Sequence, residues 1–366
     1  MSARVFWAPG RVNLIGEFTD LVGGPVLPAA LDLGVRIEAE AAETIDLCSH
    51  ELGGRARLAA DGSPLGDENE GWARYVAAVA VELALLGRPA AGLEGEISST
   101  LPIGAGLSSS AALEVAAGLA LCAAAGFSLE PLELAQAARR AEHRAVGVPC
   151  GILDQAASLL GRAGSAVLLD TGSLAYEYIP LPAGLALVII DSGVSRRLES
   201  SGYATRQEEV ERALAAFTGR DPTEITLAEL ETAEAKGRLD SIAARRLRHA
   251  ISEGERVREV ARLLGDPTPA SLQRLGEVFA AGHESVRSDW EASTPELDLL
   301  VELAREKGAI AARMTGGGFG GSIVALAWTD EAEGLADAVL SAYESHADAQ
   351  AKAYVCSASD GAREIS

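Results

Sequence analysis

The feature that most constrains the fold is a glycine- and serine-rich loop that runs directly into an almost wholly apolar helix. The segment reads LPIGAGLSSSAALE over Leu101–Glu114. The apolar residues predict a helix from about Ser108 to Ala125, with Gly126 as its C-terminal stop. Because a helix that is apolar on every side has to be buried, we expect this one deep in a core.

The loop before this helix is typical of a site that binds an anion. Gly104 and Gly106 let the backbone approach a ligand and adopt positive φ, and the free N–H groups of the first helical turn favour negative charge. Ser108, Ser109 and Ser110 add hydroxyls for phosphate oxygens or a magnesium ion. The alternative is a glycine turn followed by a serine N-cap, which needs only one serine. We favour the phosphate site.

Lysine is almost missing from the chain, and this limits how phosphate can be held. The only lysines are Lys236, Lys307 and Lys352, so the first 235 residues contain none. A P-loop of the form GxxxxGK[ST] is therefore absent. Phosphate chemistry in the N-terminal half has to depend on backbone N–H groups, a metal ion and arginine.

Length and charge exclude several classes of protein. The chain has 366 residues, a length that predicts about two domains. Its 53 acidic and 31 basic residues give a formal charge of -22, which leaves no basic face for nucleic acid. We attribute this acidity to solubility, because a diffuse negative field repels anionic ligands such as phosphates.

No segment predicts a membrane span, a signal peptide, a disulfide framework or a zinc site. The apolar run Val115–Phe127 is far shorter than the roughly 20 residues of a span, and Met1–Gly10 lacks a basic stretch followed by an apolar core. The four cysteines form no CxxC, and the five histidines form no HExxH. We expect a cytoplasmic protein.

Strands come first along the chain and long helices later. In the first half we expect strands at Val5–Trp7, Gly10–Glu17, Pro25–Leu33, Ala166–Leu169 and Leu185–Ile190, and helices at Trp72–Leu86, Ser108–Ala125 and Pro131–Val146. In the second half we expect helices at Tyr203–Phe217, Ile242–Leu264 and Ser271–Gly282, and a strand at Ile323–Trp328.

This uneven order predicts an α+β fold with a boundary near residue 185, hence an N-terminal domain over 1–185 and a C-terminal domain over 186–366. The helices of the second half are rich in arginine and glutamate. We interpret them as solvated faces and assign them no site.

Polar residues crowd into the segment Gly10–Asp20, which includes Arg11, Asn13, Glu17 and Asp20. Carboxylates accept hydrogen bonds from neighbouring sugar hydroxyls, so the segment fits polyol recognition. An ordinary polar turn with a surface ion pair explains it equally well.

A second polar group, Asp154 with Gln155, follows Glu142 within an apolar stretch punctuated by glycine and proline. If Arg11 lies beside Asp154, that carboxylate stays ionised and can accept a hydroxyl proton. On spacing alone, an aspartate that caps a helix is as good an explanation.

A second glycine-rich segment, Met314–Ser322, formally contains GxGxxG. A dinucleotide site of this type should follow a strand and open a helix, whereas here the apolar run Ile323–Leu326 predicts a strand. We therefore expect a turn that approaches a ligand or the opposing domain.

In this order, the four segments resemble the GHMP small-molecule kinases and, within them, the galactokinases. The resemblance is carried by Gly10–Gly24 (GRVNLIGE-x-TD), Pro102–Glu114, Pro149–Gln155 (PCGI-x-DQ) and Arg313–Gly321. It implies a two-domain fold with the active site in the cleft between the domains. It also implies ATP-dependent phosphorylation of D-galactose at its anomeric hydroxyl, giving α-D-galactose 1-phosphate and ADP, with ATP and Mg²⁺ required.

The same resemblance assigns roles residue by residue. Asp154 matches the catalytic base and Arg11 its partner, while Ser110 and Glu142 match the magnesium ligands. The implied sugar site comprises Glu17, Phe18, Asp20, Gly151 and Tyr203. The implied nucleotide site comprises Trp72, near the adenine, with Pro102, Gly104, Ala105, Gly106, Leu107, Ser108, Ser109 and Ser110 around the triphosphate.

The chain departs from the galactokinase pattern at Phe18, where histidine is usual, and at Leu21, where tyrosine is usual. Loss of one neutral hydrogen bond to the sugar's 6-hydroxyl costs only about 0.5–1.5 kcal/mol, so galactose can remain the substrate. One alternative is a sugar 1-kinase for arabinose, 6-deoxygalactose or galacturonate. Another is a non-catalytic sensor of galactose and ATP. We expect the chain to act as a monomer.

Overall fold

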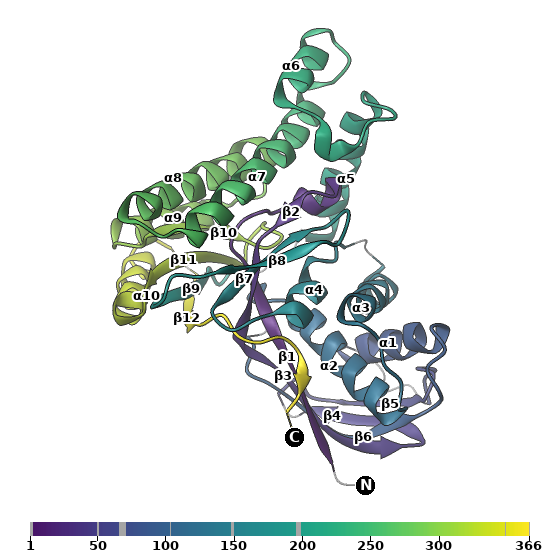
Figure 1. The fold of residues 1–366 in the computed structure, drawn as a ribbon. Coiled ribbons are helices and arrows are strands. Elements are labelled where there is room, and N and C mark those ends of the chain that lie inside the picture. The colour runs from purple at the N-terminus through teal and green to yellow at the C-terminus, as the bar shows by residue number, and fades with distance from the viewer. Residues whose placement is uncertain are drawn as a thin grey trace.

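The structure, a computed structural model, describes residues 3–49, 51–65, 71–102, 104–147, 150–194, 199–347 and 349–365; the side chains of residues 199–201 and 203 lie outside it. Helices and sheets are mixed as an α+β fold predicts, with helices of the second half gathered away from the large sheet of the first half (Figure 1). No helix in the described ranges is long and apolar enough to cross a membrane.

The first half forms a six-stranded sheet with helices packed on it (Figure 1). The strand order is β13-β1-β3-β6-β4-β5, with only the β4–β6 pair parallel. The strands are β1 (Arg4–Asn13), β3 (Pro28–Ala42), β4 (Thr44–Ser49), β5 (Arg55–Ala59), β6 (Gly92–Ser99) and β13 (Arg363–Glu364). The helices are α1 (Ala73–Leu85), α2 (Ser109–Ala124), α3 (Pro131–Val146) and α4 (Leu153–Leu160).

The apolar helix α2 lies at the centre of this half, as its composition predicts. It packs on β1 and β3, and α1, α3 and α4 pack around it. Even its one charged residue, Glu114, is fully buried. Because α2 is packed on all sides, its N-terminus has a fixed position, and so does the glycine- and serine-rich loop that precedes it.

The second half forms a four-stranded antiparallel sheet in the order β10-β11-β9-β12. Its strands are β9 (Leu185–Asp191), β10 (Ala311–Thr315), β11 (Ser322–Trp328) and β12 (Lys352–Cys356). The helices are α5 (Glu199–Ala215), α6 (Leu227–Ala235), α7 (Ser241–Gly265), α8 (Pro269–Ser285), α9 (Pro295–Glu306) and α10 (Thr329–Glu344), with a π-helical turn η3 (Val286–Trp290) after α8. The continuous apolar run of β9 is a central strand, as expected.

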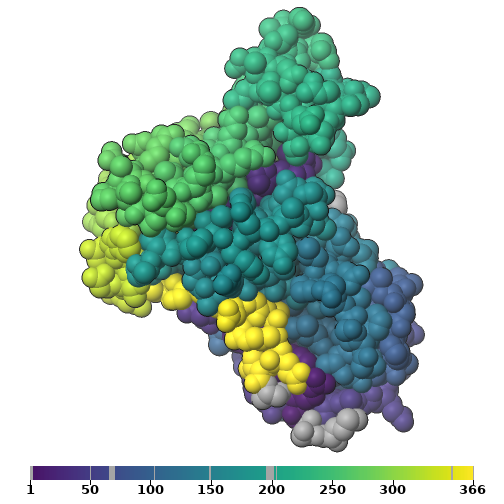
Figure 2. All heavy atoms as spheres, in the orientation of Figure 1, coloured from purple at the N-terminus to yellow at the C-terminus, as the bar shows by residue number. Residues whose placement is uncertain are grey.

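A smaller sheet joins β2 (Pro25–Val26), β7 (Ser165–Asp170) and β8 (Tyr176–Pro180), and short 3-10 turns lie at η1 (Thr19–Val22) and η2 (Pro222–Glu224). The chain end then returns to its beginning, because β13 pairs with β1 through Phe6 and Trp7. In Figure 2 these last residues, in yellow, lie against the purple N-terminal strand.

The first strand differs from its prediction. Two strands were expected, at Val5–Trp7 and Gly10–Glu17, whereas β1 is continuous to Asn13. The pairing of β1 with β3 is irregular between Pro9 and Arg11, as in a β-bulge. Pro9 and Gly10, which predict the end of a strand, are therefore accommodated within β1. The chain then leaves the sheet, so that only the part of the polar segment after Asn13 forms a loop rather than a strand.

Three chain segments meet at the junction of the two halves. The Arg11 N–H donates to the Leu107 carbonyl (3.2 Å), which joins the end of β1 to the serine loop. The Asn13 N–H donates to Thr315 Oγ1 (3.2 Å), which joins β1 to β10. Ser322 Oγ, on β11, donates to the Ala105 carbonyl (2.6 Å). These bonds bring the motifs of the sequence to one place.

Candidate active site

A cavity of about 1040 Å³ opens where these segments meet. Most residues that the sequence assigned to the site line it: Arg11, Glu17, Phe18, Asp20, Trp72, Gly104, Gly106, Leu107, Ser108, Ser109, Ser110, Glu142, Gly151 and Asp154. Pro102 and Ala105 do not line it; Ala105 is fully buried and its carbonyl is held by β11. The side chain of Tyr203 lies outside the described residues.

Asp154 sits in the first turn of α4 with its carboxylate held from two sides. Arg11 Nε donates to Oδ1 at 2.7 Å, and Ser108 Oγ donates to Oδ2. The alternative of a helix-capping aspartate is wrong, because Ile152 is the N-cap residue of α4. Arg11 Nη1 also donates to the Gly106 carbonyl (2.8 Å). One guanidinium therefore connects the candidate base to the candidate phosphate loop.

The serine loop has the conformation that its glycines predict. Gly104 and Gly106 have φ of 81° and 76°, in the left-handed region that favours glycine. Ser108 is the N-cap residue of α2, but its hydroxyl makes no cap bond and turns to Asp154 instead. The interpretation as a simple serine cap is therefore wrong. The first-turn N–H groups of α2 remain available to an anion.

Ser110 and Glu142 lie together on the cavity and could both bind a divalent cation. Ser110 Oγ donates to Glu142 Oε1 at 2.9 Å, so a hydroxyl and a carboxylate oxygen lie within reach of one ion. Burial, then the charge of Asp154, raise the pKa of Glu142. Gln155 Nε2 donates to Glu142 Oε2 (2.6 Å) and to Glu114 Oε2 (3.0 Å). Among the described residues, no group of three His, Cys, Asp or Glu side chains could hold a metal.

Asp20 and Gly151 meet at the other end of the cavity. A Cβ atom on Gly151 would lie 1.7 Å from Asp20 Oδ2, so glycine is required for the carboxylate to lie there. Burial, then the charge of Asp154, raise the pKa of Asp20 to about 6. Asp20 and Asp154 both line the cavity, which therefore presents two carboxylates close enough to interact.

Glu17 is only 3% exposed and is surrounded by donors. Its Oε1 accepts from Asn13 Nδ2 (3.0 Å) and from the Gly316 N–H (3.4 Å), and its Oε2 accepts from Arg313 Nη2 (2.7 Å). Burial raises the pKa of Glu17 to about 7 against the opposing effect of Arg313. The Gly316 contact also confirms that the second glycine-rich segment is a turn, between β10 and β11, that approaches the site.

Three family models match the chain. They are the GHMP kinases N terminal domain over residues 74–162, the galactokinase galactose-binding signature over residues 2–40 and the GHMP kinases C terminal model over residues 270–345. A galactokinase of Pyrococcus furiosus is 37% identical over 361 residues, 99% of either chain. The chain belongs to the galactokinase family of the GHMP kinases.

Solved structures agree with this family. The crystal structure of Lactococcus lactis galactokinase complexed with galactose matches with a TM-score of 0.91 at 32% identity, covering 100% of this chain and 96% of that one. The mevalonate kinase of Methanococcus jannaschii matches with a TM-score of 0.65 at 18% identity, covering 98% and 99% of the two chains. This second likeness shows the fold alone.

Phe18, where this galactokinase family usually has histidine, is turned into the second half of the chain. Its ring stacks on Trp290 at a centroid distance of 4.6 Å and an interplanar angle of 15°. The residue is 6% exposed, has φ of 67° and still contributes to the cavity wall. Leu21 packs against the same apolar cluster. This part of the cavity wall therefore carries an aromatic ring.

The sequence patterns do not predict the apolar wall of the cavity that includes Trp72. Trp72 Nε1 donates to the Gly53 carbonyl (2.7 Å), which fixes the indole. The same cavity is lined by apolar side chains of β3, α1, β6 and α2 and of the loop after β6, namely Val35, Tyr75, Ile97, Leu113 and Leu101. The sequence could not show this wall, because β6 was not predicted and β3 was not followed as far as Val35.

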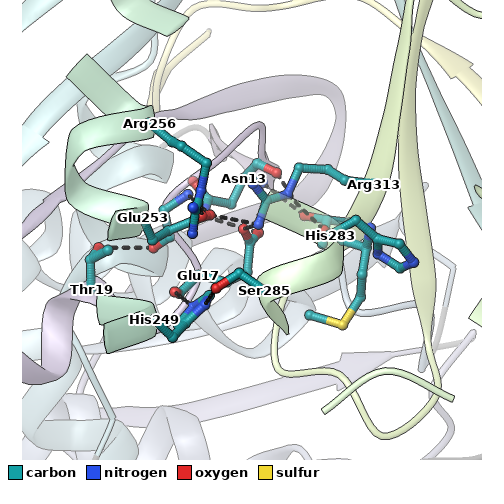
Figure 3. A network of polar contacts seen from close by, with 12 residues as sticks. Asn13, Glu17, Thr19, His249, Glu253, Arg256, His283, Ser285 and Arg313 are labelled. Atoms are coloured by element: carbon teal, nitrogen blue, oxygen red, sulfur yellow. Dashed lines mark hydrogen bonds and ion pairs between the residues drawn. The ribbon is translucent and has the colours of Figure 1, made fainter. Parts of the chain in front are cut away.

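The interpretation of the later helices as solvated faces is wrong for one face of α7. His249 and Glu253 are fully buried there, and Glu253 is ion-paired with Arg313 of β10 at 2.6 Å (Figure 3). A signal was present, because His249, Glu253 and Val257 follow one another at a spacing of four residues and so share the buried face of the helix.

Proposed function

We propose that this chain is a galactokinase that transfers the γ-phosphoryl group of ATP to the anomeric hydroxyl of D-galactose, giving α-D-galactose 1-phosphate and ADP. One observation carries the proposal. Asp154, held by Arg11 and Ser108, lines the same cavity as the serine loop and the carboxylates of Glu17 and Asp20. This arrangement supports a phosphate site and a sugar site that share one proton acceptor.

In the proposed mechanism, Asp154 accepts the proton of the anomeric hydroxyl while the sugar oxygen bonds to the γ-phosphorus and the bond to the bridging oxygen of ADP breaks. Arg11, bonded to Asp154 and to the loop, stabilises charge that develops between them. A loose phosphoryl-transfer transition state needs alignment and charge neutralisation more than strong base catalysis. The glycine turn, the helix N–H groups and Arg11 supply these without any lysine.

Ser110 and Glu142 fit Mg²⁺, because both offer hard oxygen atoms and the ion usually keeps its other positions for water and phosphate. When bound, the ion would neutralise negative charge on the phosphates. This is needed because Asp154 and Glu142 also give the cavity negative charge. The buried carboxylate is held in place by Gln155, so the ligand is oriented before the ion arrives.

Replacing Glu142 by glutamine should raise the Mg²⁺ concentration for half-maximal activity by about tenfold, because a charged ligand becomes neutral. Titration of the ADP complex with Mn²⁺, followed by electron paramagnetic resonance, checks the affinity without turnover. Glu133→Gln, at an exposed position of α3, serves as the matched control. Equal cation affinity in the two variants contradicts the ligand assignment.

A related sugar with an altered C6 is the second candidate substrate. The observation in its favour is the stacking of Phe18, which lines the cavity, on Trp290. An aromatic wall tolerates a sugar without the 6-hydroxyl, such as 6-deoxygalactose or arabinose, better than a polar one does. Galacturonate, with a charged C6, fits this wall least well.

We expect Phe18→His to raise the preference for galactose over 6-deoxygalactose by roughly two- to twelvefold, the value of about 0.5–1.5 kcal/mol for one neutral hydrogen bond. The ratio of kcat/KM values for galactose, 6-deoxygalactose and arabinose measures this preference. An unchanged ratio means that position 18 does not reach the C6 side of the sugar.

The remaining alternative is a sensor that binds galactose and ATP without turnover. The chain retains Asp154, Arg11, Ser110 and Glu142, and each lines the cavity, which favours catalysis. ADP release on addition of galactose decides between them. We also propose that the chain works as a monomer in the cytoplasm, where ATP is available, because all the groups used above come from a single chain.

A further inference from the structure

Glu17 lies in the first half of the sequence, yet the second half holds it. Figure 3 shows its carboxylate facing Arg313 of β10 and the side chains of α7. Arg313 Nη2 lies 2.7 Å from Glu17 Oε2 and 2.6 Å from Glu253 Oε1, so one nitrogen is shared by two carboxylates. Arg256 Nε donates to the other oxygen of Glu253 at 2.7 Å.

The backbone around Glu17 is held by the same helix. Glu253 Oε1 accepts from the Gly16 N–H (3.1 Å), and His249 Nε2 donates to the Glu17 carbonyl (3.1 Å). Burial lowers the pKa of His249 to about 4, so the ring is neutral and its Nδ1 accepts from Ser285 Oγ (2.9 Å). A Cβ atom on Gly16 would lie 2.9 Å from Val257 Cγ2, which shows how closely the loop packs on α7.

Charge balance explains why the ionised carboxylate of Glu17 depends on residues from the second half of the chain. Arg313, Glu17 and Glu253 are each no more than 3% exposed. A buried charge is costly unless it is paired and hydrogen-bonded, and two buried carboxylates without a cation cannot both stay ionised. Arg313 and Arg256 supply two positive charges to the two carboxylates, so Glu17 can be an anion at the edge of the cavity.

We propose that Arg313 and Glu253 are positioning residues for sugar recognition, which hold the Glu17 carboxylate at the angle from which it accepts the 6-hydroxyl of the sugar. This inference rests on the proposed function. Neither residue touches the sugar; they act through Glu17 and through the backbone of Gly16. Sugar recognition in the N-terminal half thus depends on the packing of α7 and β10 against it.

The first test compares two sugars in the Arg313→Lys variant. Lysine keeps the positive charge but lacks the planar guanidinium, so the carboxylate of Glu17 is no longer held in one orientation. At pH 8 we expect kcat/KM for galactose to fall about tenfold, and kcat/KM for 6-deoxygalactose, which has no 6-hydroxyl, to change less than twofold. A purely structural defect lowers both values equally, and that result would overturn the proposal.

The second test uses Glu253→Gln, which is isosteric and still accepts from Gly16. The charged and titratable groups around Glu17 are Arg313 of β10, Glu253, Arg256 and His249 of α7, and His283 of α8 (Figure 3). Burial and, against the effect of Arg313, the charge of Glu253 raise the pKa of Glu17 to about 7, so galactose kcat/KM should decline as the pH falls through 7. In Glu253→Gln this decline should move to lower pH, while an unmoved decline contradicts the proposal.

Glu209→Gln is the matched control. Glu209 of α5 pairs through Oε2 with Arg246 Nε at 2.7 Å, and Arg246 lies on α7, the helix that also carries Glu253. Both residues of this pair are buried, but neither contacts Glu17. We expect this variant to lose stability while keeping the ratio of the two sugars and the pH profile. If Glu209→Gln changes the sugar ratio or the pH profile as much as the test variants do, any disturbance of α7 has this effect, and the specific role of Arg313 and Glu253 is contradicted. If the unmodified chain does not phosphorylate galactose, the proposed function fails instead.

Discussion

Replacement of Asp154 by asparagine should lower kcat with galactose by roughly a hundredfold or more and leave ATP binding largely intact. Asparagine cannot take up the hydroxyl proton, and a general base contributes about 10²–10⁴-fold. Its oxygen can still accept from Arg11, which remains anchored on the Gly106 carbonyl, so the loop should keep its shape. Steady-state turnover and calorimetric titration with an ATP analogue measure the two effects separately.

A matched variant separates catalysis from stability in this experiment. Asp170→Asn changes the end of β7, where the carboxylate accepts from Ser173 away from the cavity. We expect it to retain turnover. Near-normal turnover of Asp154→Asn would refute the assignment of the base. Loss of nucleotide binding in that variant would show that Asp154 acts mainly by holding the loop through Arg11.

The second large effect is expected from Gly151→Ala, which should raise the KM for galactose by roughly 10–150-fold with little change in the KM for ATP. The added Cβ atom would stand 1.7 Å from Asp20 Oδ2, so the carboxylate has to leave its place. One hydrogen bond to a charged acceptor contributes about 1.5–3 kcal/mol, which corresponds to that range. Initial rates over both substrate concentrations give the two KM values.

Gly334→Ala is the control for this substitution. Gly334 lies in α10, and a Cβ atom there meets nothing within 4 Å, so alanine should leave both KM values unchanged. If Gly151→Ala binds galactose normally, Asp20 is not a sugar ligand in this chain. If both KM values rise together, the substitution has disturbed α4 and its Asp154 as well.

Elements with strong local signals were predicted well. The helix expected at Pro131–Val146 is α3 with the same bounds, because Pro131 starts it, a capping box of Glu130 and Glu133 closes its N-terminus, and Gly147 ends it in the left-handed conformation. By contrast α4 was missed. It has only eight residues and follows a glycine- and proline-punctuated stretch, so packing against α2 and α3 rather than its own sequence decides its helical state.

The domain boundary near residue 185 stays a prediction. The start of β9 at Leu185 agrees with it, since the four-stranded sheet begins there. The return of β13 to β1 has no signal in the sequence, because a strand of two residues carries no periodicity.

The sequence by itself determined the chemistry of single segments. Glycines before a buried apolar helix, serines at its start and the lack of lysine in the first half predict an amide-built anion site, because φ preference, helix dipole and side-chain type are local properties. Only the tertiary structure decided which residues far apart in the sequence form ion pairs. Arg313 and Glu17 are 296 residues apart, and Arg11 and Asp154 are 143 apart. Such pairs form because burial penalises an unpaired charge, and which partners meet is set by how the sheets and helices pack.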